Sequence, residues 1–171
     1  RNALSVQLAQ AGASVSLDGL YLIHKNHHSD NHTIISHQKS DTSSNQVYKG
    51  ILNDHARGVF NGKIEVVRQA QKVEAHQLNN NLLLNRNAEI DTKPELAIDA
   101  NDIICTHGAT VGQLDSDELF YLESRGIPHS LAQAMLTKGF AGQILEKIEP
   151  TLFKDFCYQI LSLFSQQEDL P

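Results

Sequence analysis

Apolar and β-branched residues in the first two thirds of the chain recur in short runs separated by Gly, Asn, Asp or Ser. This alternation predicts β-strands, and no stretch before residue 115 has the 3.6-residue periodicity of a useful helix. The predicted strands lie at residues 14–17, 20–23, 32–35, 46–48, 63–67, 82–84, 89–91, 96–98 and 103–105.

The last of these runs are regularly spaced, seven residues apart, and centre on Leu83, Ile90, Ala97 and Ile104. A short regular repeat favours the stacked turns of a β-solenoid over the strands of a sandwich. Against this, Asp18-Gly19 and Asn61-Gly62 are dipeptides that strongly favour tight antiparallel hairpins. The pattern alone therefore leaves solenoid and sandwich open.

From Asp115 onward the apolar residues recur at intervals of three and four, which predicts amphipathic helices. Asp115 and Glu118 resemble a capping box, and Gly126 lies where this first helix would end. Three more helices are predicted, from Pro128 to Gly139, from Ile144 to Pro150, and from Leu152 to Phe164 with a polar tail after it. The chain thus divides into a β domain at residues 1–114 and a helical domain at residues 115–171.

The 171-residue chain has 14 Lys and Arg against 20 Asp and Glu, a net charge of −6. An acidic surface argues against a nucleic-acid partner, because a phosphate backbone is bound by excess Lys and Arg. No apolar run reaches the roughly 18 residues of a membrane span, and no secretion signal is visible. The two cysteines lie far apart, which argues against a disulfide framework and favours a reducing, cytoplasmic location.

The first residues, Arg1 and the alternating run Asn2 to Val6, already have the pattern of a strand. We therefore expect a further N-terminal region to precede this sequence. No Gly-rich phosphate loop occurs, so any ATP-driven step is expected to belong to a partner.

Cys105 and His107 are two residues apart in a predicted strand, so their side chains share one face with Cα atoms about 6.6 Å apart. A thiolate and an imidazole at this spacing can approach the same iron or sulfur species. Two ligands cannot fill the four-ligand environment of a typical cluster, so a functional pair needs further ligands from a partner subunit or a bound sulfide. From spacing alone, a small buried cysteine beside a hydrogen-bonded histidine is the more common interpretation.

A second group of potential ligands is His27, His28, Asp30 and His32. In an extended chain His28 and His32 lie about 13 Å apart, too far to share one ion, so this stretch is predicted to be a surface turn. The run Asn79 to Asn81 indicates a solenoid turn or an asparagine ladder.

Glu89 and Asp91 share a strand face and are candidates for the paired carboxylates of a β-helix polysaccharide hydrolase or lyase, together with Asp99. Arg86 and Lys93 lie close by, which favours a surface charge ladder instead. The absence of Trp and the few aromatic residues also argue against a carbohydrate-binding groove.

Longer motifs point to a family. In order along the chain they are QVYKGIL at 46–52, ARGVFNGKI at 56–64, AEIDTKPEL at 88–96, CTHGATVGQLD at 105–115, LFYLESRGI at 119–127 and GFA at 139–141. Together they resemble the SufB/SufD family of iron-sulfur cluster assembly proteins over roughly residues 12–148. Within the family, the chain looks more like the SufD branch. The SufB branch looks like it carries a glutamate after the motif histidine, where this chain has Gly108.

The resemblance implies a mainly β fold, a right-handed β-helix followed by a small C-terminal helical domain, and it overrides the hairpin at Asn61-Gly62. It implies a scaffold subunit that is not itself an enzyme. This subunit would pair with a SufB-like subunit through the β-helix and with a SufC-like ATPase through the helices.

The family's nascent cluster lies at the junction of the two subunits, so the resemblance makes His107, and less strongly Cys105, candidate ligands of a transient iron-sulfur cluster. It also implies a reduced flavin associated with the assembled complex, and no cofactor in the chain alone. Without the paralogue, pairing of exposed solenoid edges into a homodimer is expected. The candidate contacts with the ATPase, each of which could instead belong to the helical core, are Phe120, Tyr121, Leu122, Arg125 and Phe140.

Overall fold

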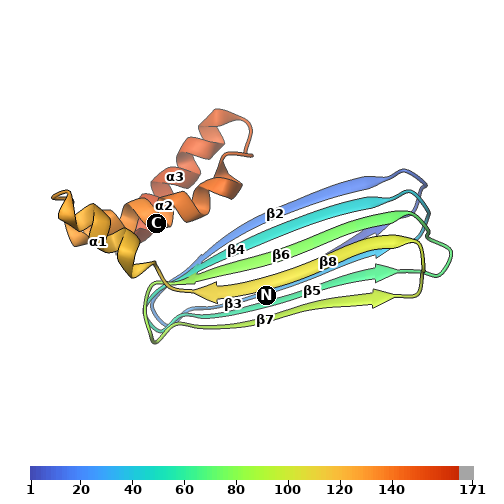
Figure 1. Cartoon of the computed structure of the whole chain (residues 1–171), viewed down its shortest axis with the longest axis horizontal. Coiled ribbons are helices and arrows are strands. Elements are labelled where there is room, and N and C mark those ends of the chain that lie inside the picture. The colour runs from blue at the N-terminus through green and yellow to red at the C-terminus, as the bar shows by residue number, and fades with distance from the viewer. Residues whose placement is uncertain (166–171) are drawn as a thin grey trace.

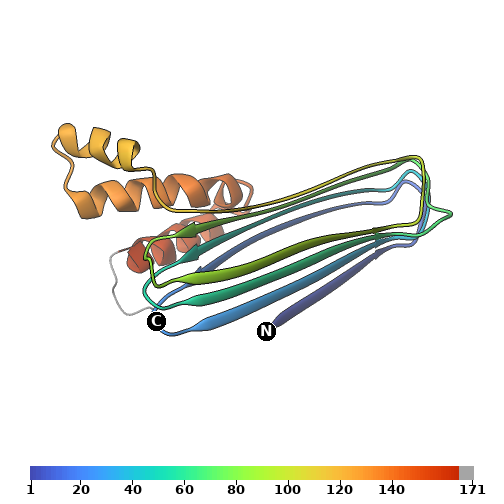
Figure 2. The ribbon, with the colours of Figure 1, turned by 60° about the horizontal axis from the view of Figure 1, so that its bottom comes forward.

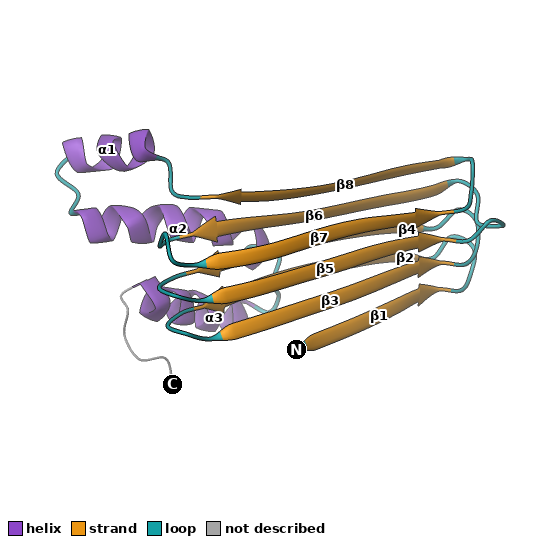
Figure 3. Cartoon of the chain, turned by 90° about the horizontal axis from the view of Figure 1, so that it is seen from below, coloured by secondary structure: helices purple, strands orange, loops and turns teal. Residues whose placement is uncertain are grey.

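The computed structural model describes residues 1–165 and has two parallel four-stranded sheets followed by three helices (Figure 1). One sheet has the order β1 (Asn2–Leu8), β3 (His28–His37), β5 (Arg57–Val66), β7 (Glu89–Ile98). The other has the order β2 (Ser14–Ile23), β4 (Ser43–Leu52), β6 (Val73–Leu83), β8 (Ile103–Gly112). Successive strands alternate between the sheets, so the chain coils as a β-solenoid, which confirms the predicted fold class (Figure 3).

Each turn of the solenoid is much longer than the predicted repeat, because it contains one strand of each sheet and the connections between them. Along one sheet, His28 pairs with Arg57 of the next turn, and Arg57 pairs with Glu89 of the turn after that. The seven-residue repeat was therefore wrong, although the solenoid that it favoured is present. Its apolar runs lie at the ends of β6, β7 and β8, where strand and turn lengths produce a local regularity.

Neither Asp18-Gly19 nor Asn61-Gly62 forms the hairpin that its dipeptide favours, and for Asn61-Gly62 this is what the resemblance implied. Gly19 lies inside β2 and Gly62 inside β5, and the runs 14–17 and 20–23 form one continuous strand. Both glycines provide space rather than a turn: a Cβ on Gly19 would lie 2.6 Å from the ring of Tyr48, and one on Gly62 would lie 2.5 Å from Nε2 of Gln77. Glycine inside a strand marks such a close approach of neighbouring groups.

The interior of the solenoid combines apolar residues with a continuous hydrogen-bonded network. Asn79 and Asn81 are buried in β6, not in a turn, and the amide of Asn81 donates to Oδ1 of Asn79 at 2.7 Å. Thr92 of β7 also donates to Oδ1 of Asn79, at 2.8 Å. These bonds satisfy polar groups that would otherwise destabilise the core.

The helices are α1 (Ser116–Ser124), α2 (His129–Leu145) and α3 (Thr151–Ser165). The predicted start and end of the first helix are confirmed: Oδ1 of Asp115 accepts the backbone N–H of Asp117 at 2.7 Å and that of Glu118 at 3.2 Å. Gly126 then turns the chain with φ of +84°.

Gly139 does not end the second helix, because α2 continues through it to Leu145. The separate helix predicted from Ile144 to Pro150 is therefore absent from the described residues, which hold three helices where four were predicted. A glycine inside a helix costs about 1 kcal/mol, which burial of Ala141 and Leu145 offsets. The polar tail predicted after the last helix, residues 166–171, lies outside the described residues.

Helices α2 and α3 cover one end of the β2-β4-β6-β8 sheet (Figure 2). One apolar cluster joins sheet and helices and consists of Ile51, Leu82, Ala141, Leu145, Leu161 and Phe164. Lys49 of β4 is buried at this junction, where its Nζ donates to the backbone oxygen of Phe140 at 2.8 Å. Among the described residues, no helix is both long and apolar enough to cross a membrane.

Candidate functional site

The last turn of the solenoid leaves its interior open. Side chains on alternate residues of β6 point inward and are buried, among them Gln77 and Asn79. The register places His107 beside Gln77 and Ala109 beside Asn79 on β8, yet His107 and Ala109 are exposed. No strand follows β8 in its sheet within the described chain, so nothing here covers these inward positions. We call this surface, formed by the inward faces of β7 and β8, the open end.

Cys105 lies on this inward face, at the margin of an apolar cluster. It is half-buried beside Ala75, its neighbour in the register, and packs against the buried cluster to which Ala75 belongs. Burial raises the pKa of the Cys105 thiol above its usual value, and a hydrogen bond with the Ala75 backbone acts in the opposite direction. The thiol is therefore protonated at neutral pH and must release a proton before it can bind a metal.

His107 lies on the same face, two residues further along β8, and is exposed. The residue between them, Thr106, points to the outer face, where its hydroxyl lies 2.7 Å from Nδ1 of His76. The structure therefore places the thiol and the imidazole together at the open end, one half-buried and the other accessible.

This pair is incomplete as a metal site. Within residues 1–165, no group of three or more His, Cys, Asp or Glu side chains is placed to hold a metal ion. Iron-sulfur clusters usually have four protein ligands, so any cluster at the open end needs ligands from beyond the described residues.

Three of the five candidate contacts for the ATPase are exposed on α1 or directly after it. The side chains of Phe120 and Tyr121 are 70% and 57% exposed, and the guanidinium of Arg125 lies 5.2 Å from the Tyr121 ring. Leu122 is half-buried. Phe140 is also half-buried and lies at the junction with the sheet, where the Lys49 amine is 4.2 Å from its ring. Its position fits a core residue better than a free contact.

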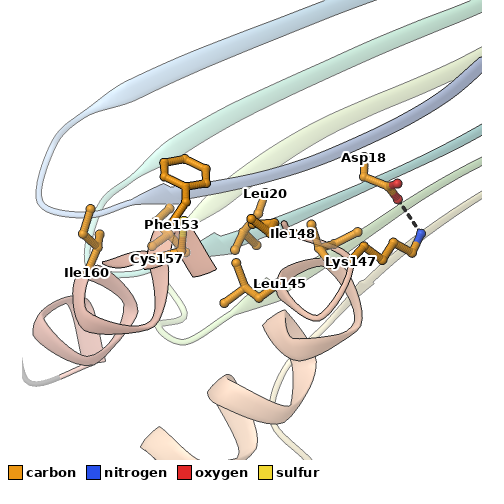
Figure 4. Close-up of a pocket in the computed structure, with 10 residues that line it drawn as sticks. Asp18, Leu20, Leu145, Lys147, Ile148, Phe153, Cys157 and Ile160 are labelled. Atoms are coloured by element: carbon orange, nitrogen blue, oxygen red, sulfur yellow. Dashed lines mark hydrogen bonds and ion pairs between the residues drawn. The ribbon is translucent and has the colours of Figure 1, made fainter. Parts of the chain in front are cut away.

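Sequence reasoning missed an apolar groove of about 480 Å³ between β2 and the last two helices (Figure 4). Leu20 of β2, Leu145 of α2 and Phe153 of α3 line it, and an ion pair of 2.6 Å between Lys147 and Asp18 closes one side. The apolar residues of α3, spaced three and four apart, were the sequence signal for this groove. An amphipathic helix usually buries such residues in the core, so the pattern did not indicate a groove. Leu152, Phe153 and Phe156 are instead exposed.

The histidine-rich stretch contains a strand rather than the predicted surface turn, because His28 begins β3. His32 and Asp30 lie on one face, with Nε2 and Oδ1 2.7 Å apart. Arg1 lies 3.6 Å from the same carboxylate, so these groups pair with each other on the surface.

Glu89 and Asp91 are exposed on the outer face of β7. Asp91 pairs with Arg57 of the neighbouring strand at 3.3 Å, and Lys93 pairs with Glu95 at 3.2 Å. The predicted charge ladder is thus present, with Arg57 in the place expected for Arg86. A carboxylate tied to a guanidinium on an open strand face is poorly suited to acid–base cleavage of a polysaccharide.

Comparison with known proteins agrees with the fold and the motifs. The family model described as "SUF system FeS cluster assembly, SufBD core domain" matches residues 1–140. Similar proteins include "Iron-sulfur cluster assembly protein SufD" of Escherichia coli, which is 39% identical over 167 residues, 98% of this chain and 39% of that protein. An "Iron-sulfur cluster assembly SufBD family protein" of Synechocystis sp. is 46% identical over 120 residues, 70% of this chain and 26% of that protein. The chain therefore spans well under half the length of these relatives.

Proposed function

Because the chain belongs to the SufB/SufD family of iron-sulfur cluster assembly proteins and is similar to its SufD members, we propose that it is part of a scaffold subunit for cluster assembly. This subunit pairs with a SufB-like paralogue at the open end of the solenoid. Cys105 and His107 supply two ligands to a transient cluster, and the paralogue supplies the others.

The observation that carries this proposal is that the inward positions, which are buried on β6, become exposed on β8. The same positions are buried one turn earlier, at Gln77 and Asn79, so a covering surface would bury His107 and Ala109 in the same way. The unpaired backbone edge of β8 offers hydrogen bonds to an added strand. A paralogue with a similar solenoid can satisfy both requirements.

The raised pKa of the Cys105 thiol fits a transient role. A protonated, half-buried thiol does not hold iron firmly by itself, and it becomes a ligand only when iron displaces its proton. The exposed imidazole of His107 is accessible first, so we assign it the larger share of cluster binding.

In the same proposal, a SufC-like ATPase docks on the helices and supplies the energy for rearrangement. The exposed aromatic pair of α1, Phe120 and Tyr121, is well suited to such contact because aromatic side chains contribute strongly at protein interfaces. Helix α2 is tied to β4 by Lys49, so force on the helices reaches the solenoid through this contact.

The test is reconstitution of the intact protein with a SufB-like and a SufC-like protein, an iron source and a persulfide donor, with the cluster absorbance as readout. We expect His107→Ala to lower the cluster yield at least tenfold without changing complex formation or thermal stability, because the imidazole is exposed. Cys105→Ser should lower it less. His55→Ala, at an exposed histidine in the turn before β5, is the matched control and should have no effect. Full cluster yield with His107→Ala would refute the ligand role.

A further inference from the structure

Gln77, in the third turn of the solenoid, has a buried oxygen without a partner. Its side chain is 2% exposed, and its Nε2 donates to Oε1 of Gln46 at 2.8 Å. Gln46 in turn donates from its Nε2 to the hydroxyl of Thr33 at 2.7 Å. Oε1 of Gln77 is buried and has no hydrogen-bond partner among the described residues. A buried acceptor left unpaired is costly and calls for an explanation.

The chain of amides gives the direction of this oxygen. Gln46 of β4, Gln77 of β6 and His107 of β8 occupy the same register position in three successive turns. The nitrogen of the Gln77 amide bonds to Gln46 of β4, so the oxygen, on the other branch of the amide, is left for a group on the opposite neighbour of β6, which is β8. The next inward side chain in that direction is His107.

His107 is the complementary group. Its ring has no hydrogen bond among the described residues, and it is exposed, so it can rotate about its side-chain bonds. Adjacent strands lie about 4.8 Å apart, which brings the ring within reach of the Gln77 oxygen. A neutral imidazole has one protonated nitrogen, which can donate a hydrogen bond, and one unprotonated nitrogen, which can bind metal. An acceptor that bonds to one nitrogen keeps the proton there and leaves the other nitrogen for the metal.

We propose that Gln77 is the positioning residue of His107: its Oε1 accepts a ring N–H of His107 and so directs the other, bare nitrogen out of the open end. This inference rests on the proposed function, in which His107 is a cluster ligand. Metal-binding histidines commonly donate their second ring nitrogen to a carbonyl or carboxylate oxygen, and loss of that oxygen typically lowers metal affinity roughly 10–100-fold. The buried glutamine ladder holds that oxygen in place from inside the solenoid.

The first experiment measures the tautomer of His107 in the intact protein, without partners or metal. Nitrogen-15 labelling of histidine and long-range proton–nitrogen correlation spectra report which ring nitrogen is protonated, and the His107→Ala spectrum assigns the signal. We expect one tautomer to dominate for His107 and Gln77→Met to change the tautomer ratio. His55, which is exposed, serves as the internal reference.

The matched control is Thr33→Val, at the inner end of the ladder. It removes the bond between Gln46 and Thr33 but keeps the bond from Gln77 Nε2 to Oε1 of Gln46, so the tautomer ratio of His107 should stay as in the wild type. An unchanged ratio in Gln77→Met would overturn the proposal. If Gln77→Met does not fold, the wild-type spectrum provides the test. A tautomer ratio of His107 equal to that of exposed His55 would also overturn the proposal.

The second experiment measures cluster yield in the reconstituted complex. Gln77→Met should lower it roughly 10–100-fold, and Thr33→Val should not. A tautomer change without a loss of cluster would overturn the positioning role. If instead His107→Ala itself leaves the yield intact, the proposed function fails, whereas the tautomer measurement still reports on the contact between Gln77 and His107.

Discussion

At the scale of single residues, the chemistry of the open end follows from where the solenoid stops. A glutamine or asparagine at an inward position of β6 is buried and hydrogen-bonded, whereas the corresponding histidine of β8 is exposed. Cys105 lies between these extremes, and burial keeps its thiol protonated. In the proposed site, the readiness of Cys105 to bind metal therefore depends on its burial, which a covering partner would change.

A residue inside the solenoid makes the stability of the fold depend on pH. His37 is fully buried, and its ring nitrogens lie 2.8 Å from the hydroxyl of Thr42 and 2.9 Å from that of Ser44. Burial lowers the pKa of His37 below its usual 6.5. As the pH falls below about 6.5, the unfolded chain takes up a proton that the folded chain does not, so stability is lost by up to about 1.4 kcal/mol per pH unit.

We expect His37→Gln to remove this loss. Urea unfolding at pH 7.5 and 5.5 measures it: the free energy of unfolding should fall more steeply with acidification in the wild type, by about 1 kcal/mol over this range. Parallel pH dependences for the two proteins would show that His37 is not the group responsible.

At the scale of elements, β8 and α1 are both weakly covered, and they are adjacent in sequence. β8 is an edge strand with an exposed inward face, and α1 contains no buried residue. The stability of α1 therefore depends on local features, such as the Asp115 cap, more than on packing. Two weakly covered elements in succession are well suited to contact two different partners.

The role of α1 can be separated from that of α3. Phe120→Asp should weaken binding of the SufC-like ATPase at least tenfold, about 1.4 kcal/mol, because an aromatic side chain at an interface is replaced by a charge. The folded state should be unaffected, since this side chain is 70% exposed. Leu152→Asp, at an 82% exposed position of α3, is the matched control. Stronger weakening by Leu152→Asp in a binding titration would move the docking surface to α3 and its groove.

At the scale of the whole molecule, sequence reasoning succeeded where local chemistry decides the structure. The capping box at Asp115 and the stop at Gly126 follow from rules that act within one turn of helix. Sequence reasoning failed where packing between residues far apart in the sequence determines the structure. Gly19 and Gly62 suggested hairpins but accommodate side chains from other strands, and Gly139 suggested a helix end but lies in a helix held by the sheet.

The candidate site divides in the same way. The two-residue spacing of Cys105 and His107 correctly placed both on one strand face, because side-chain alternation is local. The buried partner of that face, Gln77, belongs to the preceding turn of the solenoid, and only the register of β6 and β8 brings it beside His107. No periodicity in the sequence indicated that the two residues are neighbours.

The pairing surface itself is the largest-scale prediction. Val111 lies at an inward position of β8, where it follows the buried Asn81 in the register and is 49% exposed. Val111→Lys should leave the fold intact, because a long charged side chain at this position can reach water. It should weaken binding to the SufB-like paralogue at least tenfold, because pairing would bury the added charge.

Leu78→Lys is the control, since Leu78 is 38% exposed on the outer face of the neighbouring strand β6. Both variants add the same charge to the same sheet, so general electrostatic effects on association cancel between them. Analytical ultracentrifugation of each variant with the paralogue measures the difference. Equal affinities, or a greater loss with Leu78→Lys, would place the paralogue on the outer face of the sheet, and the open end would then need another explanation for its exposed histidine.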